Sequence, residues 1–256
     1  MKPTQSILII GGGNMGGALA RRWHEAGFAV HVVESNEQRR RELSADGLPC
    51  YAELAAAPTT EIAVLAIKPQ QFKPENFVLA DTFCISIMAG ISLAQLSTIT
   101  QSWVRIMPNL PSVIGEGMSV ACAPALPPAE RTLVDTLFSI IGHIEWVENE
   151  AAMHAVTAIS GSGPAYVFAL MEALEVAATK LGLTPELAHR LVAQTAKGAA
   201  LLADQSTDDF ATLRRNVTSP GGTTEAALKQ LEKHGLMQMV EDAAEAATIR
   251  SKELSE

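Results

Sequence analysis

Apolar residues occur in short, almost continuous runs through the first 150 residues, and each run is followed by a segment with helical spacing. The runs predict strands at Ile7–Ile10, Ala29–Glu34, Ile62–Ile67, Phe83–Met88, Val104–Met107, Met118–Ala123 and Ile144–Val147. The segments between them predict helices at Met15–Glu25, Glu37–Ala45, Leu93–Thr100 and Ala129–Ile141. Strands that are apolar on both sides and alternate with helices are typical of a mostly parallel sheet with helices on both faces. The later strands are short, which is compatible with antiparallel pairing at the edge.

After Glu150 the strand-like runs disappear and only helical spacing remains. The pattern predicts helices at Ala151–Ile159, Ala165–Leu181, Pro185–Leu202, Asp209–Arg215, Thr224–Lys233 and Met237–Glu253. Glycine and proline separate them, and Thr184 followed by Pro185 has the residue types of a helix start. We therefore expect two domains, residues 1–149 with the sheet and residues 150–256 with helices only.

The first predicted strand leads into a glycine-rich turn. Gly11, Gly13 and Gly16 form the spacing G-x-G-x-x-G between the strand and the helix that follows it. In this setting the first glycine allows a tight turn, the second lets the backbone approach a pyrophosphate, and the third lets the helix pack on the strand. The helix N-terminus then faces the phosphates with its free N–H groups. The segment predicts a doubly wound, Rossmann-type domain that binds a dinucleotide.

The end of the second predicted strand gives mixed information about which dinucleotide binds. Glu34 stands where a carboxylate accepts hydrogen bonds from the adenosine ribose, which favours NAD. Ser35, Asn36, Arg39 and Arg40 follow directly and are suited to holding a 2′-phosphate. From these residues alone both cofactors remain open.

Two more strand ends are expected at the same edge of the sheet. Ala66-Ile67-Lys68-Pro69 ends the third strand with a cation and a rigid turn, and Met88-Ala89-Gly90 ends the fourth. Ligands of this architecture bind at the carboxyl ends of the strands. We therefore predict that both segments border the nucleotide, with a solvated lysine as the alternative for Lys68.

Composition narrows the classes of function. The net charge of −9 disfavours a nucleic-acid partner. The three cysteines form no paired spacing, which favours a reducing compartment, the cytoplasm. No stretch has the length and apolarity of a membrane span. The six histidines show no metal-ligand spacing, so no metal site is expected.

A second unusual segment lies between two predicted helices of the later half. Ser219-Pro220-Gly221-Gly222-Thr223-Thr224 combines two glycines and a proline with hydroxyl residues at a helix start. Such a segment concentrates free backbone N–H groups and hydroxyls, which suits a small carboxylate. The simpler alternative is a helix cap by Thr223 or Thr224.

The segment from Val217 to Leu228 closely resembles the signature of pyrroline-5-carboxylate reductases. Four other stretches resemble the same family in the same order: the Gly11–Gly16 turn, Ala66–Pro69, Arg105–Pro111 and Ser160–Tyr166. The resemblance covers nearly the whole chain. It implies a Rossmann domain, a helical dimerisation domain, NADPH or NADH as hydride donor, and homodimers or larger assemblies of dimers.

The resemblance also implies roles for individual residues. Gly11, Gly12, Gly13, Asn14, Met15, Gly16, Ala66, Ile67, Lys68 and Pro69 are expected to hold the cofactor, with Asn36 near the ribose. Ser219, Gly221, Gly222, Thr223 and Thr224 are expected to bind the imine substrate. Thr224 matches the hydroxyl residue that hydrogen-bonds the ring nitrogen, and it is the predicted catalytic residue. Reduction of 1-pyrroline-5-carboxylate to L-proline is the activity that the resemblance implies.

Two alternatives belong to other classes. A β-hydroxyacid dehydrogenase shares the two-domain plan but places a lysine on the first long helix of the second domain, where Ser162–Leu170 has none. A nucleotide-sensing module without catalysis requires only the first domain, and the Ser219–Thr224 segment disfavours it.

Overall fold

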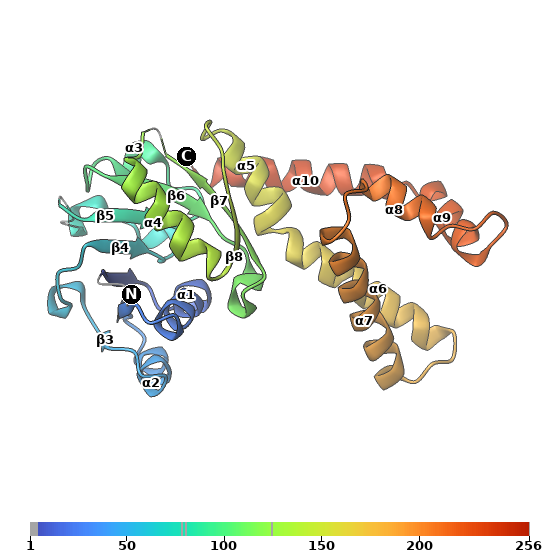
Figure 1. The fold of residues 1–256 in the computed structure, drawn as a ribbon, viewed down its shortest axis with the longest axis horizontal. Coiled ribbons are helices and arrows are strands. Elements are labelled where there is room, and N and C mark those ends of the chain that lie inside the picture. The colour runs from blue at the N-terminus through green and yellow to red at the C-terminus, as the bar shows by residue number, and fades with distance from the viewer. Residues whose placement is uncertain (1–4, 78, 80, 124, 256) are drawn as a thin grey trace. The chain divides into compact units, whose positions relative to one another are not determined.

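The computed structural model describes residues 5–77, 79, 81–123 and 125–255 of the chain. Their contacts divide into two compact units, Met1–Pro164 with Ala246–Glu256 and Ala165–Glu245. The first unit contains the whole sheet, and the second contains only helices (Figure 1).

The sheet of the first unit has eight strands in the order β3-β2-β1-β4-β5-β6-β7-β8. The strands are β1 Ser6–Ile10, β2 Ala29–Val33, β3 Cys50–Tyr51, β4 Ile62–Leu65, β5 Phe83–Ser86, β6 Trp103–Met107, β7 Gly117–Cys122 and β8 Gly142–Trp146. All pairs are parallel except β6 with β7. Chain order reverses beside β1, which is where ligands of such sheets bind. The α/β fold class and the mostly parallel sheet are confirmed.

Helices and connecting segments cover both faces of this sheet. The helices are α1 Asn14–Glu25, α2 Glu37–Ala45, α3 Leu93–Leu96, α4 Pro128–Ser139 and α5 Ala152–Val156. On one face, Trp23 of α1 packs edge-to-face on Phe138 of α4, and its indole N–H donates to the Leu137 carbonyl at 2.8 Å. On the other face, Leu96 and its neighbours cover Leu65 and Cys84. Burial raises the pKa of the Cys84 thiol to about 12, so this cysteine is an inert part of the core.

Two differences from the sequence-based elements have local causes. The strand β3 was not predicted, because two residues at an edge carry no periodicity. Helix α3 ends at Leu96 rather than at Thr100. The hydroxyls of Ser97 and Thr98 donate to the carbonyls of Ala94 and Gln95, and such local bonds compete with the helix.

The expected helix at Ala151–Ile159 is also divided. Its second part is a π-helical turn, Thr157–Gly161. The side-chain amide of Asn109 donates to the Ser160 carbonyl at 3.3 Å, and Asn109 also accepts the Met118 N–H at 2.8 Å. Turns of this type often occur at functional positions.

The compact first unit extends past the expected domain boundary at Asn149. Met153 of α5 is fully buried and packs with Met107, Val120 and Cys122 of the sheet. The side chains of His154 and Ser251 are hydrogen-bonded at 3.0 Å, so the last turns of α10 belong to the same unit. Residues 150–164 therefore fold with the sheet, although their helical spacing resembles that of the later half.

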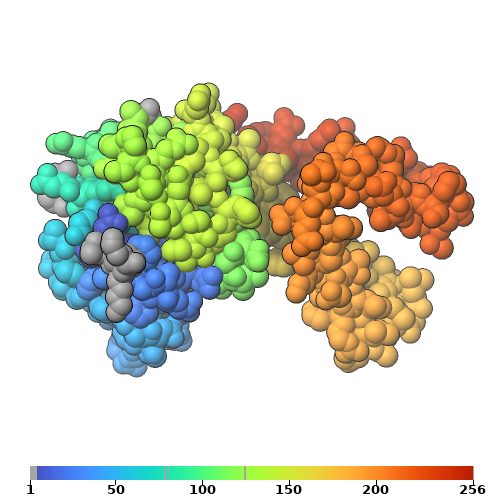
Figure 2. Space-filling view, in the orientation of Figure 1, coloured from blue at the N-terminus to red at the C-terminus, as the bar shows by residue number. Residues whose placement is uncertain are grey.

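The second unit has almost no core of its own. It contains most of α6 Gly163–Lys180 together with α7 Pro185–Asp204, α8 Phe210–Asn216, α9 Thr223–Lys233 and the first half of α10 Leu236–Glu253. Every residue of this unit is described, and Ala188 alone is buried. Phe168, Leu181 and Phe210 are 56%, 85% and 80% exposed. Figure 2 shows the side chains of this unit in colours from gold to red.

Candidate functional site

A cleft of about 1280 Å³ lies in the first unit along the carboxyl ends of β1, β2, β4 and β5. Its lining includes thirteen of the sixteen predicted cofactor residues: Gly11, Gly13, Asn14, Met15, Glu34, Ser35, Asn36, Ala66, Ile67, Lys68, Pro69, Met88 and Ala89. Segments that are far apart in the chain are thus brought together at one edge of the sheet. Gly12, Gly16 and Gly90 do not line the cleft.

The glycines of the turn differ in how much space a side chain would have. Gly11 has φ +108°, and a Cβ there would lie 2.6 Å from the Ala66 carbonyl oxygen. A Cβ on Gly16 would lie 2.0 Å from the Gly11 carbonyl oxygen. At Gly13 the nearest atom to a Cβ is the Arg39 guanidinium nitrogen, 3.7 Å away. The fold therefore requires Gly11 and Gly16, whereas the open space at Gly13 fits the approach of a ligand.

The start of α1 is available for an anion. Gly13 is its N-cap residue, no side chain caps the helix, and its first turn contains no acidic residue. The first N–H groups of a helix have no partner inside it, and the helix dipole favours negative charge there. These observations fit the pyrophosphate of a dinucleotide at this position.

Glu34 is buried, and both of its carboxylate oxygens accept hydrogen bonds from backbone N–H groups. One oxygen accepts the Gly12 N–H at 2.9 Å, and the other accepts the Asn36 N–H at 2.7 Å. This explains why Gly12 is turned away from the cleft. Glu34 holds the glycine turn to the start of α2, a role that sequence spacing did not distinguish from binding of the ribose.

The other polar residues after β2 surround the start of α2. The Asn36 side chain caps this helix by accepting the Arg39 N–H at 3.0 Å. Arg40 donates to the carbonyls of Glu34 and Ser35, at 2.7 and 2.6 Å. Arg39 lines the cleft and makes no side-chain ion pair within the described part of the chain. Of the two arginines, Arg39 is therefore the one whose guanidinium remains available to a ligand.

Sequence patterns did not indicate several residues of the cleft wall. These are Ala52, Glu53, Leu54, Gln71, Asn76 and Phe77. They lie in the short 3₁₀ segments Leu54–Ala56, Pro69–Gln71 and Pro74–Asn76 or directly beside them, and these segments carry no period. Ala52 and Glu53 follow β3, and Phe77 follows the last of the three segments. Only Gln71 had an indirect signal, because it follows the Lys68-Pro69 turn and its side chain accepts the Lys68 N–H at 3.3 Å.

The predicted substrate residues lie together at the start of α9 in the second unit. Gly221 has φ +71°, and Gly222 is the N-cap residue of the helix, with no side-chain cap. Thr223 and Thr224 are the first two helical residues, so neither is the cap that formed the simpler alternative. The hydroxyls of Ser219, Thr223 and Thr224 make no hydrogen bond within the described residues and are available to a ligand.

One carboxylate of the protein already contacts this helix start. Glu225 accepts the Gly221 N–H at 2.6 Å and pairs with Lys229 at 2.9 Å. Hydrogen bonding to Lys229 and to the Gly221 amide lowers the pKa of Glu225, so the group is ionised at neutral pH. The Gly221 amide can therefore hold a carboxylate. A groove of about 770 Å³ lies beside it between α8, α9 and α10, and none of the five predicted substrate residues lines that groove.

Comparisons with known proteins agree with both halves of this description. Residues 150–254 match the model of the family "pyrroline-5-carboxylate reductase dimerisation", and residues 6–90 match "NADP oxidoreductase coenzyme F420-dependent". The chain is 40% identical to the pyrroline-5-carboxylate reductase of Pseudomonas aeruginosa, over 99% of this chain and 98% of that one. The chain belongs to the pyrroline-5-carboxylate reductase family. The family that the sequence motifs indicated is thereby confirmed.

Solved structures of the family have the same fold along their whole length. A pyrroline-5-carboxylate reductase from Coxiella burnetii has a TM-score of 0.88 and 33% identity, over 99% of this chain and all of that one. The Plasmodium falciparum pyrroline carboxylate reductase, solved with NADP bound, has a TM-score of 0.84 and 31% identity, over 97% and 100%. The match includes the sheet and the helices of the later half, so the Rossmann-type domain followed by a helical domain is the fold of this family. The individual site residues stay predictions.

The described residues contain no candidate for a membrane span or a metal site. None of their helices has the length and apolarity needed to cross a membrane. Among the same residues, no group of three or more His, Cys, Asp or Glu side chains is placed to hold a metal ion.

The different roles of the glycines predict different effects of the same substitution. Gly13→Ala should leave the thermal midpoint within about 2 °C of wild type, because its methyl group makes only an ordinary contact, 3.7 Å from the Arg39 guanidinium. It should weaken dinucleotide binding about tenfold or more, because the methyl group lies where the backbone must approach the pyrophosphate. Gly16→Ala should instead lower the free energy of unfolding by about 1–3 kcal/mol through overpacking against Gly11. Thermal denaturation and nucleotide titration measure both. Equal destabilisation by the two variants would contradict this division of roles.

Proposed function

We propose that the protein reduces 1-pyrroline-5-carboxylate to L-proline with a hydride from NADPH or NADH. The observation that carries the proposal is full-length membership of the family together with two separate binding elements in the chain. One is the glycine-lined cleft of the first unit, and the other is the hydroxyl-rich start of α9. A spectrophotometric assay of NADPH and NADH oxidation with 1-pyrroline-5-carboxylate is the direct test.

The residues at the start of α9 fit a cyclic imino acid. The backbone N–H groups and the positive end of the helix dipole suit its carboxylate. Gly222 has no side chain to cover these donors, and the Thr224 hydroxyl is free to hydrogen-bond the ring nitrogen. A bound nicotinamide would supply the hydride that adds to the carbon of the C=N bond. The nitrogen becomes an amine, and an imine that arrives protonated needs no strong acid from the protein.

Glu225 affects how the substrate carboxylate is received. Its negative charge stands at the same helix start and occupies the Gly221 N–H. The carboxylate of the substrate must replace Glu225 as the acceptor of the Gly221 N–H. Glu225 then keeps its ion pair with Lys229. The positive charge of Lys229 supports this exchange, because it offsets the repulsion between two nearby carboxylates.

The two other hypotheses account for fewer of the residues. A β-hydroxyacid dehydrogenase does not explain the unused hydroxyls at the start of α9, and the residues at the start of α6 lack the lysine that such enzymes use. A nucleotide-sensing module leaves the second unit without a role in binding. Turnover of the imine separates the proposal from both, because a sensor binds the cofactor without oxidising it.

We further propose that both nucleotides are used, with a modest preference for NADPH. Ser35, Asn36 and Arg39 line the cleft and favour a 2′-phosphate, whereas the Glu34 carboxylate disfavours it. A hydrogen bond to a charged group contributes about 1.5–3 kcal/mol, so one carboxylate nearly cancels one arginine. The NADP in the Plasmodium falciparum relative supports NADPH as the preferred donor.

Glu34→Gln tests this balance. Loss of the negative charge should raise the ratio of kcat/KM for NADPH to that for NADH. The same variant should lower the free energy of unfolding by about 1–3 kcal/mol, because an amide oxygen accepts only one of the two backbone N–H groups that the carboxylate holds. An unchanged ratio with lowered stability would mean that Glu34 only supports the glycine turn.

Thr224→Val tests the predicted catalytic residue, because it keeps the shape of the side chain and removes the hydroxyl. If the hydrogen bond to the ring nitrogen strengthens as the amine forms, kcat should fall more than KM for the imine rises. The loss should be roughly 5- to 150-fold, or about 1–3 kcal/mol. Wild-type kcat/KM in this variant would remove Thr224 from the mechanism.

Gly222→Ala is the matched control for binding rather than catalysis. Its methyl group would lie 3.0 Å from the Ser219 carbonyl oxygen and would crowd the predicted carboxylate site. It should raise KM for the imine with little effect on kcat. Both variants should keep the Kd for NADPH within about threefold of wild type, since the nucleotide is assigned to the first unit.

The exposed apolar surface of the second unit supports a homodimer, and the unpaired spacing of the cysteines supports the cytoplasm as its compartment. Helices α6 and α7 leave Phe168, Leu170 and Leu191 more than 45% exposed, and a unit with one buried residue cannot stabilise itself. A second copy of the chain is the proposed cover, and the dimerisation model that matches residues 150–254 supports it. Larger assemblies would be built from such dimers.

The dimer should bury more than about 2,000 Å² of surface in total, as obligate interfaces do. Light scattering at micromolar concentration should give twice the mass of the chain or a larger even multiple. A substitution such as Leu170→Asp, which places a charge on the exposed apolar face of α6, should yield aggregated or unfolded protein. A monodisperse, folded monomer of the wild-type protein would contradict the dimer.

A further inference from the structure

The turn after β5 forms part of the cleft wall. Ile87, Met88 and Ala89 line the cleft, and the chain then passes through Gly90 and Ser92 into α3. At its beginning the turn is held by Ser86, whose hydroxyl accepts the Met88 N–H at 3.4 Å. At Gly90, with φ +80°, it passes so close to the backbone of Leu254 that a Cβ would lie 2.6 Å from the Leu254 carbonyl oxygen. The position of this wall thus depends on contacts outside the cleft.

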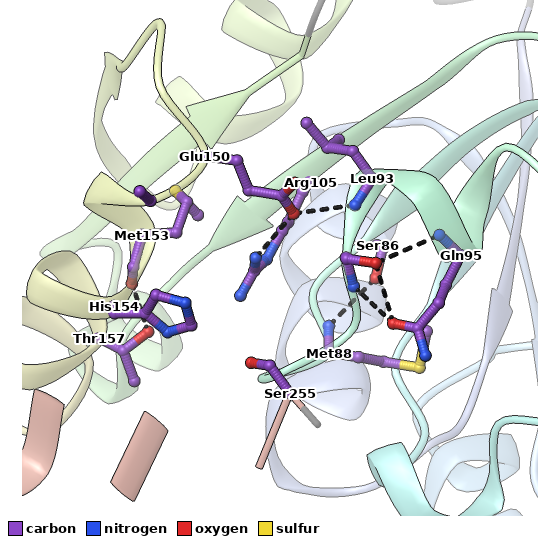
Figure 3. Close-up of polar contacts among 12 residues, drawn as sticks. Ser86, Met88, Leu93, Gln95, Arg105, Glu150, Met153, His154, Thr157 and Ser255 are labelled. Carbon is purple, nitrogen blue, oxygen red and sulfur yellow. Dashed lines mark hydrogen bonds and ion pairs between the residues drawn. The ribbon is translucent and has the colours of Figure 1, made fainter. Parts of the chain in front are cut away.

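One carboxylate oxygen holds the far end of the turn. Glu150 Oε1 accepts the Leu93 N–H at 2.8 Å and the Arg105 Nη1–H at 2.9 Å (Figure 3). Leu93 is the first residue of α3, and Arg105 lies on β6 in register with Ser86. The two ends of the turn are therefore tied to the same pair of strands, one through Ser86 and the other through Glu150.

Burial of the charged Arg105 side chain at this position costs free energy. Its side chain is 2% exposed, and Nε and Nη2 are buried without a partner among the described residues. Figure 3 shows the guanidinium between Glu150, His154 and Met88. The Glu150 side chain is 30% exposed, so the pair is buried on the arginine side only, and such a pair contributes little net stability compared with apolar side chains of similar size. The arrangement is better explained by the geometry that it imposes.

Among the described residues, Glu150 is the only group that accepts a hydrogen bond from the Arg105 guanidinium. Burial, followed by the charges of Arg105 and Lys252, lowers the pKa of His154, so its imidazole is neutral at pH 7. That ring is hydrogen-bonded to Ser251. Burial, followed by the charge of Glu150, raises the pKa of Cys122, so this neighbour is a neutral thiol. Neither group replaces the carboxylate.

We propose that Glu150 and Arg105 are positioning residues for the cofactor cleft. Their ion pair fixes the Leu93 amide, and through it the turn from Met88 to Ser92 that forms one wall. The inference rests on the proposed use of this cleft for NADPH. Neither residue touches the cofactor, and their effect on the reaction is exerted through the shape of the wall.

Leu93→Pro removes the donor without breaking the helix. Proline is tolerated at the first helical position, and Ser92, with φ −81° and ψ 159°, has the conformation that a residue before proline requires. Leu93→Ala is the matched control, since it shortens the side chain but keeps the N–H. KM for NADPH should be about tenfold higher in Leu93→Pro than in Leu93→Ala, and KM for the imine at saturating NADPH should differ by less than about twofold.

Glu150→Ala and Leu93→Pro together form a double-mutant cycle. Glu150→Ala should raise KM for NADPH about as much as Leu93→Pro, and the double variant should show no further increase, because both changes break the same contact. Glu150→Gln keeps an acceptor oxygen and should restore part of the affinity. If Glu150→Ala does not fold, the comparison of the two Leu93 variants decides alone.

The outcomes separate this proposal from the proposed function. A wild-type protein that does not oxidise NADPH with the imine would overturn the function. Active protein with equal KM values for NADPH in Leu93→Pro and Leu93→Ala would overturn the positioning role alone. A thermal midpoint that falls without any change in KM would assign Glu150 a purely structural part, and multiplying effects in the double variant would show that the two groups act independently.

Discussion

The close approach of α1 to the end of β1 is the constraint on which the cleft depends. At Gly11 and Gly16 a hydrogen atom is the largest substituent that fits, because a Cβ on Gly11 would lie 2.6 Å from the Ala66 carbonyl oxygen and a Cβ on Gly16 would lie 2.0 Å from the Gly11 carbonyl oxygen. This contact sets the helix start against the sheet edge and leaves the open space at Gly13. The buried carboxylate of Glu34 then ties the turn to the start of α2, so one short segment shapes both of the regions predicted to receive the phosphates and the ribose.

Much of this arrangement was predictable because it repeats simple physical patterns. Continuous apolar runs identified seven of the eight strands, and the glycine spacing located the cleft. The roles of Glu34 and Glu150 were not predictable, because each depends on backbone N–H groups that only folding brings near. The same holds for Phe77 and Asn76 in the cleft wall, which come from irregular segments. At the start of α9 the residue types indicated a binding segment, but only the structure showed that Gly222, and not a threonine, is the N-cap residue.

The two units are stabilised in different ways. The sheet is buried on both faces by contacts within the chain, as Trp23, Phe138 and Leu96 illustrate. The helices of the second unit have good local signals, including the Thr184 cap and the Asp209 cap, but hardly any internal burial. Helix propensity alone rarely stabilises segments of this length in water. These helices therefore depend for their stability on burial of their exposed apolar surface. The proposed dimer buries this same surface.

The first unit is assembled from two separate stretches of chain, residues 1–164 and 246–256, and the helical unit is an insertion between them. During synthesis the ribosome releases the sheet strands first, but the turn at Gly90 meets Leu254 only after the whole insertion has been made. The sheet is therefore made while one wall of the cleft still lacks its contact with Leu254. About eighty residues of exposed helix are synthesised before that contact can form. Nucleotide binding by a nascent chain would accordingly mature late, at the arrival of the last helical turns.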